Sequence, residues 1–283
     1  MTKLDARAHR STLARALFPD LAAHAARAAS VDPVELWIAK QTEELRSGAH
    51  GTALARFPEG SDSAALTAAF AVAVEIAGDT DTRAPEPEDF FAAGISPHTP
   101  SAAADLVPIV APHGLGAAAW ERVFASTQRS AGPRLALSSE ARRWFAALDH
   151  PAEQGRAAVH TRTTAGAVRW TLRWLPAGEA PPHRGAAFRV ADSPAYPTLP
   201  EILTLQRLRL ALSARPVDHA TFTWLAGELP DPRFAARHGY DEAEHTIRLS
   251  TRERTDQGAH VGVRPALTAL NATDPPAGAR PAA

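Results

Sequence analysis

Alternation of apolar and polar side chains is strongest between Arg156 and Pro176. The large apolar side chains at every second position are those of Val168, Trp170, Leu172 and Trp174. A period of two is expected of a strand with one buried face, because successive side chains point to opposite sides of a sheet. Residues 159–163 alternate in the same way, and Thr164–Gly166 supplies a short connection. The segment predicts a β-hairpin that carries its tryptophans into a core.

The first part of the chain shows helical spacing instead. Residues 3–29 are rich in alanine with leucines at helical intervals, and Asp32 followed by Pro33 favours the start of a helix that ends near Gly48. Residues 64–77 are apolar nearly all round, which is typical of a buried helix. This part of the chain is predicted to be all-helical.

Helices and strands alternate in the predictions for the second part. Helices are expected at 117–126, from 138–140 onward, and at 198–212. Strands are expected at 186–190, 221–225, 246–254 and 260–264, and the last two are predicted to form a hairpin around the turn at 256–258. The predicted class is α+β: a helical N-terminal part, then a mixed, mainly antiparallel sheet with helices packed on it.

Composition changes set the expected domain boundaries. Residues 1–80 are assigned to a helical domain, and residues 81–104, dense in Pro, Asp and Thr, to a linker with one short element around Phe90. Residues 105–270 form the expected α+β domain, and residues 271–283 an expected disordered tail.

Overall composition narrows the function only weakly. The formal net charge is −1, so no global field favours nucleic acid as a partner. There is no cysteine, which excludes disulfides, thiolate metal sites and a cysteine nucleophile. Of 30 cationic side chains only Lys3 and Lys40 are lysines, a bias typical of a bacterium with a high-GC genome. No secretory signal or membrane-spanning run is evident, so a cytoplasmic protein is expected.

Arginine and histidine occupy the polar face of the predicted hairpin. These side chains, expected to point outward, are His160, Arg162, Arg169 and Arg173, with Arg248, Arg252 and Arg264 as possible additions. Arginines arranged on a sheet face can bind a phosphate or carboxylate through paired N–H donors. The alternative is a solvated sheet face balanced by nearby acids.

A second group of candidates lies at His238, Asp241 and His245. On a helix these residues would share one face and could offer two imidazoles and a carboxylate to a divalent metal. Gly239 opposes a continuous helix, and the spacing matches no known metalloprotease pattern, so a solvated loop is the alternative.

These observations favour a cofactor-free binding or assembly protein whose arginine-rich sheet face recognises an anionic ligand or an acidic protein partner. No nucleophile can be paired with a base from the sequence, and catalysis is therefore the less favoured hypothesis. The alternatives are a metal-assisted hydrolase with its site around residues 238–245 and a nucleic-acid-binding module. A glycine pattern at Gly114 and Gly116 resembles a dinucleotide-binding turn but lacks the acidic ribose ligand.

Overall fold

The computed structural model describes residues 63–95, 106–127, 134–137, 139–149, 158–163 and 166–268. The chain divides into two units, Met1–Phe57 and Pro58–Ala283, and every described residue belongs to the second. Three predicted parts of the chain therefore lie outside the described residues: the helices within residues 3–48, linker residues 96–104 and the tail at 271–283.

The first sheet is antiparallel and is built around β4 (Gly166–Pro176). One edge of β4 pairs with β1 (Leu106–His113). The other edge pairs with β3 (Ala158–Thr163) along its first half and with β10 (Leu267–Thr268) farther on. The predicted hairpin is confirmed as β3 and β4, and Trp170 and Trp174 are fully buried.

The second sheet is mixed, with the strand order β2-β8-β7-β6-β9-β5. Parallel pairing joins β2 to β8 and β6 to β9, and the other neighbours are antiparallel. Its strands are β2 (Arg134–Leu137), β5 (His183–Arg184), β6 (Phe222–Trp224), β7 (Phe234–Asp241), β8 (Thr246–Glu253) and β9 (Val261–Val263).

Two strand predictions are wrong. The strand expected to return along β8 is β9, which lies between β6 and β5, because β7 and β2 occupy the two edges of β8. Residues 186–189 form irregular chain leading into a 3-10 turn at Val190–Ala195, and the nearby strand is β5. Alternation alone predicts a strand but not its neighbour, since pairing depends on the whole sheet.

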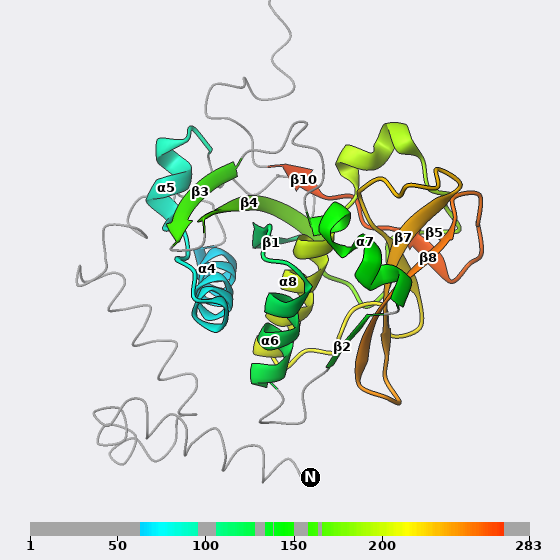
Figure 1. The fold of residues 1–283 in the computed structure, drawn as a ribbon, viewed down its shortest axis with the longest axis horizontal. Helices are drawn as coiled ribbons and strands as arrows, with labels where there is room; N and C mark the ends of the chain where they lie inside the picture. The colour runs from blue at the N-terminus through cyan, green and yellow to red at the C-terminus, as the bar shows by residue number, and fades with distance from the viewer. Residues whose placement is uncertain are drawn as a thin grey trace, which may run out of the picture. The chain divides into compact units, whose positions relative to one another are not determined.

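Five helices complete the described part of the chain, and Figure 1 shows α6 and α8 beside the first sheet. The helices predicted at 64–77, 117–126 and 198–212 are confirmed. The helices are α4 (Ser63–Thr80), α5 (Pro87–Ala92), α6 (Ala117–Thr127), α7 (Ser139–Asp149) and α8 (Leu199–Ala211). Helix α4, assigned from the sequence to the N-terminal part, packs against β1, α6 and α8.

Helix α8 is the most deeply buried of these helices. It begins with a capping box, in which the Thr198 hydroxyl accepts the Glu201 amide and the Glu201 carboxylate accepts the Thr198 amide. Every residue from Leu199 to Gln206 is buried. Its leucines and isoleucine join a core with α4, α6, α7 and the inner face of the second sheet. Three polar side chains, those of Glu201, Thr204 and Gln206, are thereby held inside the protein.

The outer face of the second sheet depends on a glycine in β7. A Cβ atom added at Gly239 would lie 2.6 Å from Cδ1 of Phe222 on the neighbouring strand. The Phe222 ring is also covered by the Arg237 guanidinium, 3.9 Å from the ring centroid, and meets His260 edge-on. The ring therefore has little freedom to move aside.

We expect Gly239→Ala to lower the free energy of unfolding by about 1 to 3 kcal/mol, because the added methyl group displaces the packed Phe222 ring. Urea unfolding measures this cost. Gly178→Ala is the matched control, since its Cβ would meet only the Ala180 carbonyl oxygen at 3.7 Å. Equal effects of the two substitutions would contradict the packing argument.

Candidate functional site

Three of the four predicted anion-binding residues share one solvent-facing side of the β3–β4 hairpin. His160 and Arg162 are exposed and Arg169 is partly exposed. His160 lies directly opposite Arg169 across the two strands. No hydrogen bond or ion pair joins the His160 or Arg162 side chain to another described residue. We call His160, Arg162 and Arg169 the basic hairpin face.

Arg173 was predicted to point outward with them, and this is wrong. Its side chain is 1% exposed, and its Nη1 lies 3.0 Å from the Glu201 carboxylate of α8. Its Nη2 donates to the Ala266 carbonyl oxygen at 2.7 Å. Arg169 and Arg173 lie on the same face of β4. That face is open to solvent at Arg169 but is covered by α8 at Arg173, four residues farther along the strand.

Glu201 is the centre of a buried polar cluster. Besides Arg173, its carboxylate accepts the Thr198 amide and the Thr171 hydroxyl, and Thr171 in turn contacts Nε2 of His113 at 2.9 Å. We call these residues the Glu201 network. The carboxylate thus both caps α8 and neutralises a buried arginine, and a buried charge needs such partners because water is absent.

A second buried cluster surrounds Asp218, which precedes β6. One carboxylate oxygen accepts a hydrogen bond from Nη2 of Arg264 at 2.7 Å, and the other accepts one from Nδ1 of His238 at 2.8 Å. Nε2 of His238 lies 3.1 Å from the amide nitrogen of Gln206 in α8. Nε of Arg264 also donates to the Thr223 hydroxyl. We call these five residues the Asp218 network; each is buried.

Arginines from this region also fix the chain that leaves β4. Arg264 donates to the carbonyl oxygens of Pro176 and Gly178, and Arg209 donates to that of Ala177. The next carbonyl, that of Glu179, accepts the Asp218 amide at 2.7 Å. Each carbonyl from Pro176 to Glu179 therefore has a donor, which ties the end of the first sheet to α8 and to the second sheet.

The charge of Asp218 depends on these neighbours. Burial by itself raises the pKa of Asp218, but the nearby Arg264 charge and the hydrogen bonds from His238 and Arg264 outweigh it. The net effect holds the pKa of Asp218 below its ordinary value, and the carboxylate is ionised at neutral pH.

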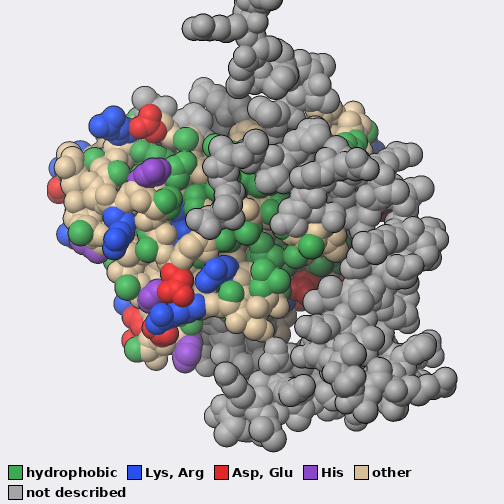
Figure 2. All heavy atoms as spheres, turned by 180° about the vertical axis from the view of Figure 1, so that it is seen from behind, with side chains coloured by type: hydrophobic (Ala, Val, Ile, Leu, Met, Phe, Trp, Pro, Cys, Tyr) green, Lys and Arg blue, Asp and Glu red, His purple; other side chains and the backbone are tan. Residues whose placement is uncertain are grey.

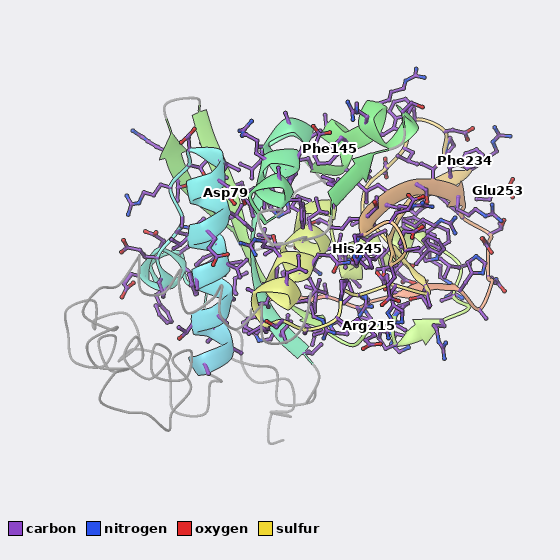
Figure 3. All side chains as sticks on the ribbon, turned by 90° about the horizontal axis from the view of Figure 1, so that it is seen from below. Asp79, Phe145, Arg215, Phe234, His245 and Glu253 are labelled. Carbon is purple, nitrogen blue, oxygen red and sulfur yellow. The ribbon has the colours of Figure 1, made fainter. Side chains whose placement is uncertain are left out.

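The three residues proposed to bind a metal are not on one helix face. His238 lies in β7 and bonds to Asp218 and Gln206, as given above. Asp241 ends β7 and accepts turn amides and Arg248, whereas His245 in the following turn contacts the Tyr240 hydroxyl. Figure 3 labels His245, with Phe234 and Glu253 at the other end of the β7–β8 hairpin. The segment is a strand followed by a turn, so the helix that the metal hypothesis requires is not formed, and among the described residues no three His, Asp or Glu side chains are grouped as metal ligands.

The remaining sheet arginines named from the sequence are neutralised or buried. Arg248 pairs with Asp241 at 2.9 Å and with Glu244 at 2.8 Å, and Arg252 pairs with Asp256 at 3.0 Å. Arg264 belongs to the Asp218 network. None of these three arginines adds a free cationic group to the basic hairpin face.

The glycine turn after β1 also has a structural role. Strand β1 leads into α6 as the pattern suggests, but β1 runs antiparallel to β4 rather than in a parallel sheet. The amide of Gly116, at the start of α6, donates to the Asp149 carboxylate at 2.7 Å. A side chain of the protein thus occupies the position where a dinucleotide phosphate would bind.

Two α8 residues of these networks, Glu201 and Gln206, were not predicted from the sequence. The capping pattern Thr198-x-x-Glu201 could have marked Glu201 as a helix-start residue. Gln206 interrupts the apolar run of the same helix, which hints at an internal hydrogen bond. Asp218 pairs with His238 of β7, a contact between residues far apart in the chain that no local pattern encodes.

We expect Arg173→Met to lower the free energy of unfolding by about 3 to 5 kcal/mol, because it leaves the Glu201 charge buried and unpaired. The double variant Arg173→Met/Glu201→Gln should recover most of this loss, since glutamine keeps the capping box without a charge. Urea unfolding measures the free energy of unfolding of both variants. A double variant no more stable than the single one would contradict the pairing of Arg173 with Glu201.

For Asp218→Asn we expect a loss of about 3 to 5 kcal/mol at pH 7, because Arg264 loses its buried counter-charge. The folded pKa of Asp218 is lowered, so its contribution is complete above the unfolded pKa of about 3.9 and is lost as pH falls through the folded value. Urea unfolding from pH 7 to pH 3 should show the wild type and variant converging only at the acid end. A gap that stays constant to pH 3 would oppose this assignment.

Comparisons with known proteins give no family for the chain. A scan against protein-family models, a search of curated proteins and a search of solved structures each found no match. Among the described residues, no helix combines the length and apolar character needed to cross a membrane. The residues and their geometry therefore carry the functional argument.

Proposed function

We propose that this protein binds an anionic ligand or an acidic protein partner through the basic hairpin face. The observation that carries the proposal is the placement of His160 directly opposite Arg169, with Arg162 two residues along the same strand face. Hydrogen-bond donors from three side chains therefore lie on one solvent-facing side of the hairpin, and a bound anion can accept hydrogen bonds from several of them at once.

The contrast with the other arginines supports this choice. Arg248 and Arg252 on the second sheet already pair with carboxylates of the chain, whereas the His160 and Arg162 side chains have no partner among the described residues. Guanidinium groups bind carboxylates and phosphates through two parallel hydrogen bonds, so an exposed arginine without an internal acid is available for such a ligand.

The two buried networks are not accessible to a ligand, which favours the basic hairpin face as the binding surface. The side chains of Arg173, Glu201, Asp218, His238 and Arg264 are each at most 1% exposed. Their hydrogen bonds go to one another, to the buried side chains of Thr171, Gln206 and Thr223, and to backbone groups, which indicates a role in the fold rather than in substrate binding.

An extended nucleic-acid surface is less well supported. Figure 2 shows one face of the molecule, on which basic, acidic and histidine side chains lie intermixed. Nucleic-acid sites gather many cations on one surface, because affinity comes largely from phosphate contacts. The basic hairpin face is small, which suits a discrete anion or a short acidic segment.

We expect Arg162→Gln and Arg169→Gln each to weaken binding of inorganic pyrophosphate or a poly-glutamate peptide about tenfold, since a hydrogen bond to a charged group contributes about 1.5 kcal/mol. Isothermal titration calorimetry at low and high salt measures the change. Arg122→Gln on α6 is the matched control, because Arg122 is exposed and lies outside this face.

Equal losses in Arg162→Gln and Arg122→Gln would indicate nonspecific charge attraction and would overturn the proposal. So would unchanged affinity together with self-association of Arg162→Gln, because charged side chains on exposed strands also prevent strands of different molecules from pairing. Tighter binding to random-sequence DNA than to the peptide would replace it with the nucleic-acid alternative.

A further inference from the structure

The orientation of the Gln206 side chain is fixed by the backbone of Val217. The Val217 amide donates to Oε1 of Gln206 at 3.1 Å, and Nε2 of Gln206 donates to the Val217 carbonyl oxygen at 2.9 Å. A backbone N–H can only donate and a carbonyl can only accept, so the two ends of the Gln206 amide cannot be exchanged.

This orientation determines the state of His238. The second N–H of Gln206 faces Nε2 of His238 at 3.1 Å, so Nε2 must accept and carries no hydrogen. The ring hydrogen is therefore on Nδ1, which donates to Asp218 at 2.8 Å. His238 is neutral, with its tautomer selected by groups from α8 and from the loop before β6.

Among the described residues, no group next to Nε2 of His238 can accept a hydrogen bond from a second ring proton. A hydrogen on Nε2 would point at the N–H of Gln206, and Gln206 cannot turn without breaking both bonds to Val217. The charged groups nearest His238 are Asp218, already bonded to Nδ1, and Arg264, whose positive charge opposes another. Neighbouring strands present only Thr223 and Leu249 opposite His238.

The loop that depends on this contact is strained. Residues 213–221 connect α8 to β6, and within them Ser213 has φ 55° and Asp218 has φ 62°. Left-handed backbone at residues other than glycine costs energy and persists only where surrounding contacts hold it. Two contacts anchor this loop to α8: Val217 is held by Gln206, and the Arg215 carbonyl oxygen accepts Nε of Arg209 at 2.7 Å. On the outer side, Arg215 pairs with Glu242 at 2.7 Å.

We propose that the contact between Gln206 and His238 is an acid-sensitive latch: when His238 takes up a proton, the 213–221 loop separates from α8. The latch does not depend on the basic hairpin face. Proton uptake places two donors against each other, and the loop opens because Gln206 must release Val217 to relieve this contact.

Amide hydrogen exchange of segment 213–221 tests the latch in the full chain. His238 can take up a proton only where Gln206 has left Nε2, so opening of this segment should increase about tenfold between pH 7.5 and pH 5.5 after correction for intrinsic exchange. His238→Asn keeps a donor for Asp218 but has nothing to protonate, and it should abolish the pH dependence. His219→Asn, which removes the neighbouring histidine beside Glu179, should leave it unchanged.

A pH dependence that survives in His238→Asn, or that disappears in His219→Asn, would overturn the proposal. Gln206→Glu provides a variant that keeps the latch testable if His238→Asn does not fold. A carboxylate opposite Nε2 accepts its hydrogen, so the acid-dependent opening should be lost or reversed. Nitrogen NMR of His238 at pH 7.5 should show hydrogen on Nδ1 and none on Nε2; the opposite tautomer would also refute the latch.

Discussion

Pairing of charged and polar groups inside the protein is the constraint on which the described fold depends. Helix α8 is buried along the whole of Leu199 to Gln206, so its polar side chains have no access to water. Each must find partners within the protein, because an unpaired buried charge costs several kcal/mol. Glu201 meets Arg173 from the first sheet, and Gln206 meets His238 from the second. The two sheets are thus positioned relative to the helix by hydrogen bonds of fixed direction.

Arg264 extends this constraint beyond the helix. It joins Asp218 and Thr223 to the carbonyl oxygens that follow β4, so one guanidinium connects the start of β6 to the end of the central strand of the other sheet. Apolar packing supplies most of the driving force for folding, but it is non-directional and does not fix the position of a helix along a sheet. Directional ionic hydrogen bonds select one arrangement among those of similar packing, which is a known use of buried polar groups in some proteins.

The division between buried and exposed arginines separates structure from proposed function. Arg173 and Arg169 are four residues apart on the same side of β4, yet one is enclosed by α8 and the other reaches solvent. A strand alternation assigns both to the same face and cannot tell where a helix covers that face. Arg173 is therefore removed from the proposed ligand-binding residues, and His160, Arg162 and Arg169 of the β3–β4 hairpin, which are exposed or partly exposed, remain.

The sequence by itself determined those helices and strands that are specified by residues close together in the chain. The β3–β4 hairpin follows from a period of two, and α8 follows from the helical spacing of its apolar residues, since backbone geometry links each pattern directly to one conformation. Tertiary structure alone decided the strand order, the burial of Arg173 and the pairing of Asp218 with His238. These depend on residues far apart in the chain, such as Asp218 and Arg264, that meet only when the sheets and α8 are assembled. A charge in a sequence has no fixed meaning until its surroundings are known, because burial and partners decide whether it supports the fold or is free to bind.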